Sequence, residues 1–316
     1  MSLPVSRRGF LELAGAGVAV GALPALAVDE RPAKSPFRFC LNTSTIREQR
    51  VGIVREVEIA AQAGYDAIEP WVDTLHSYVA DGGSLADLKK RIADAGLTVE
   101  SAIGFAQWIV DDEEARRKGL EQARRDMDVV AQIGGARIAA PPIGAHDKPG
   151  PDLVTSAKRY RALLELGVEQ GVIPQVEVWG FSKTLSRLAE TVFVAVECGH
   201  PRACVLPDVY HLHKGGSSFD SVKLLSGIAV QVFHLNDYPA EPPREKISDA
   251  DRVYPGDGVA PLGAILRDLH QAGFRGHLSL ELFNREYWKQ DPLVVARTGL
   301  QKMRASVDAA LGESAR

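Results

Sequence analysis

The stretch V-Q-V-F-H-L-N-D at residues 230–237 indicates how this chain folds and where its chemistry lies. Its first half is a mostly apolar run of β-branched and aromatic residues, which is typical of a buried strand. The run then gives way to polar residues at His234, Asn236 and Asp237. This change predicts a parallel α/β protein whose strands carry functional side chains at their carboxyl ends.

Eight short apolar runs resemble strands, and segments with helical spacing of apolar residues follow them. The expected strands lie at residues 37–41, 65–68, 97–103, 136–140, 172–176, 203–206, 228–233 and 277–280. The expected helices lie at residues 48–63, 85–95, 113–133, 152–170, 185–198, 219–225, 262–272 and 293–311. Glycine ends several of these helices, as at Gly64 and Gly96. The alternation of strands and helices predicts a parallel sheet.

The number of strand–helix units favours a closed barrel over an open sheet. Eight units fit a single (β/α)8 TIM barrel that spans residues 37–312. A doubly wound sheet would instead carry a glycine-rich phosphate turn after its first strand. Residues 42–45 at that position read N-T-S-T and contain no glycine. We therefore expect the barrel.

The first 27 residues have the composition of an export signal. Residues 6–11 read S-R-R-G-F-L, a twin-arginine pattern, and an apolar region rich in alanine and glycine follows at residues 13–26. A-L-A at residues 25–27 resembles a cleavage site. We expect a periplasmic or otherwise exported protein with a linker at residues 28–36. The apolar region is too short to predict a membrane anchor that remains after cleavage.

Composition limits the classes of partner. The chain has 316 residues, of which 45% are hydrophobic, so it can bury a large core. A formal net charge of −4 argues against a nucleic-acid partner that needs a basic surface. Three cysteines form no disulfide framework; Cys198 and Cys204 flank a turn and could pair, but buried free thiols are expected. The sequence leaves open whether the protein forms a homo-oligomer.

Four consecutive strands end in residues that bind metals. Glu177, Asp208, His234 and Glu281 lie at the carboxyl ends of the fifth to eighth expected strands. In a barrel these ends share one mouth, so the four side chains are expected to meet there. Taken singly, each is as readily a helix cap, a loop charge or a structural histidine. Unpaired converging charges would be costly, so together they predict a divalent metal: Mn²⁺, Mg²⁺ or Co²⁺, with Zn²⁺ as a further candidate.

These motifs make the chain similar to the xylose-isomerase-like barrels, a family that includes ketose 3-epimerases, hydroxypyruvate isomerase and inosose dehydratase. The resemblance extends over residues 37–312 and is most specific in the second half. It implies that Glu177, Asp208, His234 and Glu281 hold one divalent metal. It also implies that the two glutamates exchange a proton with the substrate.

Three further positions match residues that this family has near its substrate. His211 follows the expected metal-binding Asp208 by three residues, Arg252 precedes the turn P-G-D-G at residues 255–258, and Glu69 ends the second strand. A salt bridge to a neighbouring aspartate is the alternative for Arg252. The segment 235–251 is longer than the corresponding connection in the epimerases, so we expect a reshaped substrate pocket.

The resemblance implies chemistry at an α-proton. A divalent metal acidifies the α-proton of a ketone, and Glu177 and Glu281 would remove and return it. Return on the opposite face gives epimerisation, return to the adjacent carbon gives isomerisation, and loss of a β-leaving group gives elimination. His211 and Arg252 would stabilise the developing oxyanion.

The remaining expectations concern the substrate. Trp71, Trp108 and Trp179 follow the second, third and fifth strands, where indole rings either face a sugar or pack under the loops. We expect a sugar isomerase or epimerase that acts on a non-phosphorylated carbohydrate. A lyase or dehydratase of keto-sugars or keto-glycosides would use the same residues, and a non-catalytic sugar-binding barrel is a third alternative. Asn236 and Asp237 are expected to shape the long loop rather than bind the metal.

Overall fold

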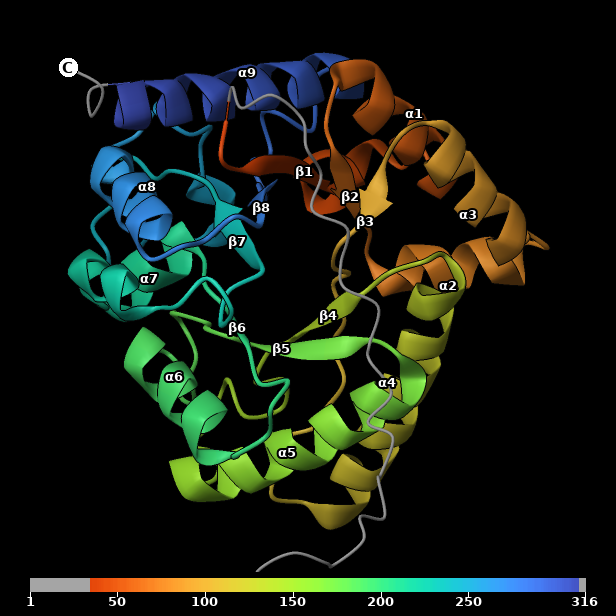
Figure 1. Cartoon of the computed structure of the whole chain (residues 1–316), viewed down its shortest axis with the longest axis vertical. Helices are drawn as coiled ribbons and strands as arrows, with labels where there is room; N and C mark the ends of the chain where they lie inside the picture. Colours follow the sequence, from red (N-terminus) through yellow and green to blue (C-terminus); the bar gives the residue numbers. More distant parts are fainter. Residues whose placement is uncertain (1–34, 313–316) are drawn as a thin grey trace, which may run out of the picture. The chain divides into compact units, whose positions relative to one another are not determined.

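Eight parallel strands form the centre of the part of the chain that the structure describes (Figure 1). The computed structural model describes residues 35–312, so the expected export signal and nearly all of the linker lie outside the described residues. The strands are β1 (Arg38–Asn42), β2 (Ala67–Glu69), β3 (Thr98–Val99), β4 (Arg137–Ala140), β5 (Ile173–Glu177), β6 (Val205–Leu206), β7 (Val232–Leu235) and β8 (His277–Leu280). Each lies at or next to a range expected from the sequence.

The strands close into a barrel through two hydrogen-bonded ladders and the seams between them. One ladder has the order β3-β2-β1-β8-β7 and the other β4-β5-β6, and all their pairs are parallel. At one seam a parallel bridge joins Asp208, after β6, to His234 in β7. At the other seam the carbonyl of Ala102 accepts from Ala139 N at 2.8 Å, and its own N–H donates to Arg137 O at 3.1 Å. This is the expected (β/α)8 TIM barrel.

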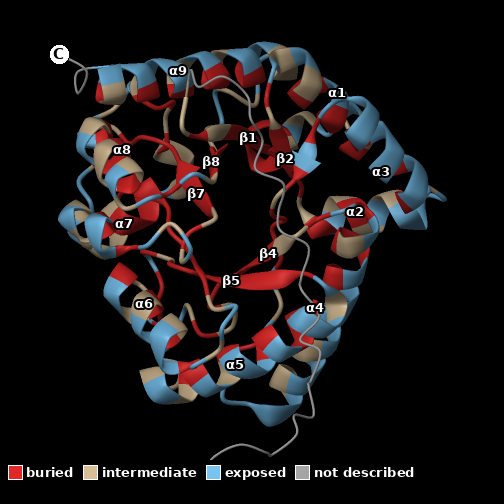
Figure 2. Cartoon of the chain, viewed as in Figure 1, coloured by how far each residue is buried: buried red, intermediate tan, exposed pale blue. Residues whose placement is uncertain are grey.

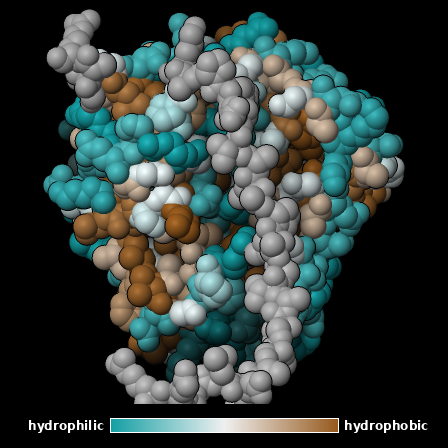
Figure 3. All heavy atoms as spheres, viewed as in Figure 1, coloured by the Kyte–Doolittle hydropathy of each residue, from teal (hydrophilic) through white to brown (hydrophobic). Residues whose placement is uncertain are grey.

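A ring of helices covers the outside of the barrel. The helices are α1 (Ile53–Ala63), α2 (Val72–Ala80), α3 (Leu85–Asp94), α4 (Glu113–Gln132), α5 (Leu153–Gln170), α6 (Leu188–Glu197), α7 (Val209–Gly215), α8 (Leu262–Gln271) and α9 (Pro292–Gly312). Short 3-10 segments are η1 (Thr43–Gln49), η2 (Phe219–Leu224) and η3 (Asp249–Asp251). The helices bury the faces that meet the strands (Figure 2), and hydrophilic residues cover much of the helical rim (Figure 3).

The helix expected at residues 48–63 is interrupted near its start. Residues Thr43–Gln49 form η1, and α1 begins only at Ile53. Arg50 and Gly52 between them have positive φ angles of 52° and 77°, which a continuous right-handed helix does not allow. Gly64 ends α1 with a φ of 93°, in the role that the sequence predicted for it.

Other differences concern short elements next to the barrel mouth. The helices α2 and α7 were not expected, and each begins directly after a strand end, at Val72 and Val209. The strand expected at residues 97–103 is reduced to Thr98–Val99, and only an isolated bridge continues it. The segment expected as a helix at residues 219–225 is the 3-10 segment η2. The structure therefore adds two short helices after strand ends, whereas β3 and the segment at residues 219–224 are less regular than expected.

The cysteines are buried free thiols, as expected. Burial raises the pKa of Cys40, of Cys198 and of Cys204, the last to about 11. At neutral pH these thiols are therefore protonated and inert, and they pack as small apolar groups. Among residues 35–312, no helix is long and apolar enough to cross a membrane.

Candidate active site

Three of the four expected metal ligands converge at the carboxyl ends of β6, β7 and β8. Asp208, His234 and Glu281 each offer one ligand atom, and these atoms lie within 4.8 Å of one another. The imidazole Nδ1 of His234 lies 3.2 Å from Glu281 Oε2 and 3.8 Å from Asp208 Oδ2. All three side chains are buried. Two carboxylates and an imidazole arranged in this way are a donor set suited to a divalent cation.

Glu69 fixes the orientation of the His234 ring by contacting the ring nitrogen that points away from Asp208 and Glu281. Its Oε2 lies 3.1 Å from His234 Nε2, and it accepts hydrogen bonds from Asn42 Nδ2 at 3.0 Å and from Ser279 Oγ at 2.6 Å. A carboxylate on one ring nitrogen leaves the other nitrogen to a metal. The Nδ1 of His234 is buried and makes no well-aligned hydrogen bond, although Glu281 Oε2 lies 3.2 Å away. This atom faces the two ligand carboxylates, so the residues present fit a metal ion.

Asp208 serves two purposes with its two oxygens. Its Oδ1 accepts from His211 N at 2.8 Å and caps α7, which is the structural role that the sequence also allowed. Its Oδ2 accepts from Asn236 Nδ2 at 2.8 Å and from Arg252 Nη1 at 3.0 Å, and faces the site. The cap therefore fixes the carboxylate so that one oxygen remains available to a ligand.

Glu177 ends β5 and is buried, but it is not one of the three residues whose ligand atoms cluster. Burial, followed by the charge of Glu281, raises its pKa well above the usual value for glutamate. Burial alone would also raise the pKa of Glu281, but His234 and Arg252 lower it below the usual value. The protein charges thus give the two glutamates opposite tendencies to hold a proton.

Arg252 is fully buried between the carboxylates. Its Nη1 donates to Asp208 Oδ2 and, at 2.8 Å, to Glu281 Oε2. Its Nη2 donates to Asp249, so the salt bridge considered from the sequence is present together with the site contacts. Burial alone would lower the pKa of Arg252, but the carboxylates Asp208, Asp249 and Glu281 raise it, so the guanidinium stays charged.

The tautomer of His211 follows from its neighbours. Gly180 N–H donates to His211 Nδ1 at 3.3 Å, which places the ring proton on Nε2. A Cβ at Gly180 would lie 2.3 Å from His211 O, so this close approach requires glycine. Burial lowers the pKa of His211 to about 3, so the ring is neutral. Its Nε2 lies 3.2 Å from Arg252 Nη2, which also donates to Asp249.

The long segment 235–251 is anchored at its base. Asp237 and Val253 form an antiparallel bridge, with mutual N–H to carbonyl bonds of 3.0 and 2.9 Å. The carboxylate of Asp237 also accepts four backbone N–H groups, those of Tyr238, Gly256, Gly258 and Ala260. Asp237 therefore shapes this segment and the following turn, as expected, and Arg252 is held next to it. The expectation for Asn236 was wrong, because its side chain bonds Asp208, Tyr210 N and Glu281 O rather than the loop.

A lysine on α7 holds the outer part of the same segment. The Nζ of Lys214 donates to the carbonyls of Arg244, Glu245 and Ile247 at 3.1, 3.0 and 2.7 Å. One ammonium group thus satisfies three carbonyl oxygens of irregular backbone. Sequence reasoning did not identify Lys214, because its partners are backbone atoms.

The three expected tryptophans lie in different surroundings. Trp71 and Trp179 are partly exposed at the mouth, and Trp71 Nε1 donates to Asn42 Oδ1 at 3.2 Å. Trp108 instead lies in the core, where its Nε1 donates to Pro141 O at 2.8 Å and its ring packs on Tyr160. The expectation that Trp108 contacts the substrate is thus corrected: with 1% of its surface exposed, it presents no face to a ligand.

Sequence reasoning also missed Asn42 and Ser279. Asn42 Nδ2 donates both to Glu69 and, at 3.1 Å, to Glu281 Oε1, so it connects the two carboxylates. Asn42 lies directly after the expected first strand, at residues 37–41, and this position was the available signal. Residues 42–45 were used only to exclude a glycine-rich phosphate turn. Ser279 lies inside β8 and gave no signal.

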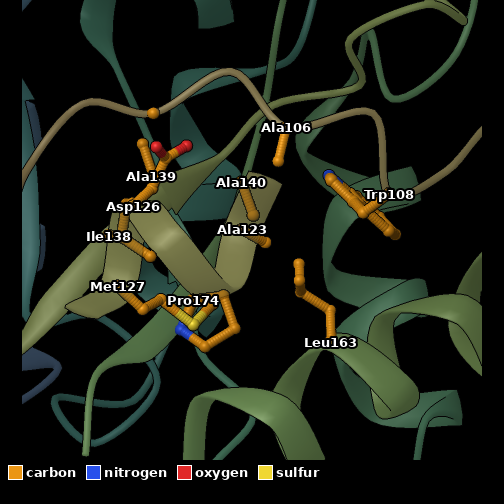
Figure 4. A pocket seen from close by; sticks show the side chains of 11 residues that line it. Ala106, Trp108, Ala123, Asp126, Met127, Ile138, Ala139, Ala140, Leu163 and Pro174 are labelled. Atoms are coloured by element: carbon orange, nitrogen blue, oxygen red, sulfur yellow. The ribbon is translucent and has the colours of Figure 1, made fainter. Parts of the chain in front are cut away.

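A separate small cavity lies outside the barrel mouth (Figure 4). Its volume of about 10 Å³ is enough for one water molecule. It is mostly apolar and is lined by residues of β4, α4 and α5, including Ile138, Met127 and Leu163. Its carboxylate, Asp126, already accepts from Gln122 Nε2 at 2.8 Å and lies 2.7 Å from His76 Nε2. This cavity is a packing defect rather than a ligand site.

Comparison with known families agrees with this geometry. The sequence profile of the xylose isomerase-like TIM barrel family matches residues 57–306 of the chain. The chain belongs to this family. Like other members of the xylose isomerase-like TIM barrel family, it places its polar side chains at the carboxyl ends of the barrel strands.

The chain is similar to curated enzymes along most of its length. It is 26% identical over 257 residues to the inosose isomerase of Bacillus velezensis, covering 80% of this chain and 91% of that protein. It is 24% identical over 272 residues to the fructoselysine 3-epimerase of Escherichia coli O157:H7, covering 83% and 96%. It is also 24% identical to the 3-dehydroshikimate dehydratase of Pseudomonas putida, but covers only 36% of that protein.

A solved structure, described as the IOLI protein with a bound zinc atom, has the same fold. Its TM-score is 0.79 at 22% identity, and the match covers 87% of this chain and 99% of that one. The similarity extends over the full barrel, so the fold of this xylose isomerase-like TIM barrel is independently supported.

Proposed function

We propose that this chain is a divalent-metal-dependent isomerase or epimerase of a non-phosphorylated carbohydrate. The observation that carries the proposal is the cluster of Asp208, His234 and Glu281, with His234 Nδ1 buried, without a well-aligned hydrogen bond and facing both carboxylates. The isomerase and epimerase among the similar proteins support the reaction class. Together they favour proton transfer next to a carbonyl group.

Asp208, His234 and Glu281 would hold the metal. Glu177, at the end of β5, is the proposed fourth ligand. When bound, the ion supplies Lewis-acid polarisation of a substrate oxygen. The oxygen-rich donor set suits Mn²⁺, Mg²⁺ or Co²⁺, and the zinc atom in the similar solved structure supports Zn²⁺ as a further candidate. Glu69, Asn42 and Ser279 hold the ligand side chains in place from behind.

Glu177 and Glu281 are the proposed proton carriers. Glu177 ends β5 and Glu281 follows β8. Among the four consecutive strands β5 to β8 these are the outer two, so the two glutamates approach a molecule at the barrel mouth from different sides. Burial raises the pKa of Glu177, whereas His234 and Arg252 lower that of Glu281, so the two carboxyls differ in their tendency to hold a proton before a metal binds. The imidazole of His211 and the guanidinium of Arg252 lie side by side, with Nε2 and Nη2 3.2 Å apart, and we propose that this pair stabilises the substrate oxygen that gains charge.

The decisive experiment follows deuterium exchange. Metal-loaded protein is incubated in D₂O with a panel of keto-sugars and inososes, and NMR records solvent deuterium incorporation and products. Glu177→Gln and Glu281→Gln should each lower turnover by about 10²–10⁴-fold, the usual size of a general acid or base contribution. Glu56→Gln, which alters a buried glutamate outside the site, should keep turnover. No exchange with any substrate would leave a sugar-binding barrel as the better description.

A lyase is the second candidate. The similar 3-dehydroshikimate dehydratase supports it, because elimination uses the same proton abstraction. In the same NMR experiment, release of water or an alcohol with loss of substrate mass would assign elimination, whereas deuterium incorporation at constant mass would assign isomerisation or epimerisation.

We further propose that the chain is exported to the periplasm by the twin-arginine route. The pattern at residues 6–11 supports this location. Cell fractionation of the native chain and of a variant with both arginines changed to lysine tests it. The native chain should appear in the periplasmic fraction and the variant in the cytoplasm; equal distribution would contradict the proposal.

A further inference from the structure

A closed rim of side chains surrounds the metal-binding cluster. Neighbours along it make ring contacts of 5.0 to 6.4 Å, and an Arg252 Nη2 to His211 Nε2 distance of 3.2 Å closes it. In order around the mouth, the rim consists of Arg252, Phe283, Trp71, Phe105, Trp179 and His211. It has a polar sector, Arg252 and His211, and an aromatic sector, the other four residues.

The polar sector lies close to the proposed chemistry. Arg252 donates to Asp208 and Glu281, and His211 follows the cap formed by Asp208. A reacting carbonyl is therefore expected on this side of the mouth. The aromatic sector lies beside it, so it faces the part of a bound molecule that does not react.

The aromatic sector extends further than one sugar ring needs. Successive ring centroids from Trp71 through Phe105 to Trp179 are 5.0 and 6.3 Å apart. Phe181 continues the series, with its centroid 5.1 Å from Trp179 and 5.6 Å from His211. A single hexose with its ketone at the metal-binding cluster would cover only the inner part of this surface.

The outer rings contact their neighbours in the series, but they are too exposed to belong to the core. Phe105 and Phe181 are 37% and 40% exposed. Arg47 covers one face of Trp71 at 4.1 Å, and the indole N–H of Trp71 is already bonded to Asn42. What the sector offers to a ligand is therefore ring faces, which bind the C–H face of a sugar or the face of an aryl group.

We propose that the aromatic sector and Phe181 form a second subsite, which binds a ring joined to the reacting sugar. The substrate class is then a glycoside, with either a second sugar or an aryl group as the outer ring. This inference rests on the proposed function for the position of the reacting sugar. It adds that selectivity for the outer ring comes from Phe105 and Phe181.

The test uses glycosides that lack a ketone, so that binding is measured without turnover. Calorimetry compares methyl and phenyl β-glycosides of glucose, galactose and xylose, together with cellobiose, in the presence of Mn²⁺. We expect phenyl glycosides or cellobiose to bind about 10-fold more tightly than the methyl glycosides. Preference for phenyl would assign an aryl outer ring, and preference for cellobiose a second sugar.

Variants assign the preference to the proposed residues. Phe105→Ala combined with Phe181→Ala should abolish the preference and leave methyl glycoside affinity unchanged. Phe193→Ala, which removes an equally exposed phenylalanine (39%) on α6, should change neither. Absence of any preference in the native protein, or a preference that survives the double variant, would overturn the inference. A preference for the phenyl glycosides or cellobiose, together with no turnover in the deuterium experiment, would instead contradict only the proposed function.

Discussion

Replacing Glu69 with glutamine tests whether this buried carboxylate prepares His234 for a metal. Glu69 Oε2 accepts from Asn42 Nδ2 and Ser279 Oγ and lies 3.1 Å from His234 Nε2. All three partners meet Oε2, and Oε1 has no hydrogen-bond partner, so the amide oxygen of glutamine can take the place of Oε2. The Glu69→Gln variant therefore keeps these contacts but removes the charge behind the imidazole.

The size of the effect follows from the position of Glu69. Loss of a residue that orients a metal ligand weakens metal binding by about 10- to 100-fold, or about 1.4–2.7 kcal/mol. Glu69 is fully buried, so the charge that the variant removes is little screened by solvent, and we expect a value toward the upper end. Ser279→Ala removes one of the bonds and should have a smaller effect, below about 10-fold.

Metal affinity is measured by calorimetry with Mn²⁺ and Zn²⁺, and the ligand field by the visible spectrum of the Co²⁺ form. Glu56→Gln is the matched control, because Glu56 is a buried glutamate that contacts none of the ligand residues through a hydrogen bond. Unchanged affinity and an unchanged Co²⁺ spectrum in Glu69→Gln would refute the role given to Glu69.

Three further predictions concern the loop, a buried acid and the core. Lys214→Met should lower kcat/KM about 10-fold without changing metal affinity, because the segment that carries Arg252 loses three hydrogen bonds. Lys214→Arg, which keeps a donor at this position, should retain part of the native kcat/KM. Burial raises the pKa of Glu56 to about 7. The folded state therefore retains a proton that the unfolded state releases near pH 4.5. The free energy of unfolding should fall by about 3 kcal/mol as the pH rises from 4.5 to above 7. Chemical denaturation at several pH values should show that the free energy of unfolding of Glu56→Gln lacks this fall. Trp108→Phe should lower stability by about 1–3 kcal/mol, because Pro141 O loses its donor, with KM unchanged.

Each of these has a clear contrary result. Equal kcat/KM in Lys214→Met and the native protein would mean that the loop needs no ammonium group. A parallel pH dependence in Glu56→Gln would assign the fall to other groups. A rise in KM in Trp108→Phe at unchanged stability would return Trp108 to the substrate site.

Much of the barrel could be predicted because its signals are local. An apolar run that turns polar, as in residues 230–237, marks both a strand and its functional end, and eight such units leave few other folds. The ends at Asp208, His234 and Glu281 were therefore placed correctly before their distances were known. The short helix α7 was missed because seven residues contain too little periodicity to predict it.

What could not be predicted depends on contacts between strands far apart in sequence. Asn42 bonds Glu281 across 239 residues, and Ser279 bonds Glu69 across 210. Neither partner changes the local pattern of its own strand. Trp108 shows the opposite limit: its position after the third strand suggested the mouth, but its ring lies in the core against Tyr160 and its N–H donates to Pro141 O.

The two backbone hydrogen bonds between Asp237 and Val253 hold the ends of the intervening loop together, so the outer part of this loop can vary. Because its two ends are already tied together, doubling its length costs only about 0.6 kcal/mol of chain entropy. Changes of length or sequence at residues 239–243 can thus alter what enters the mouth, while Asp249 and the carbonyls bound by Lys214 keep Arg252 in its place over the carboxylates.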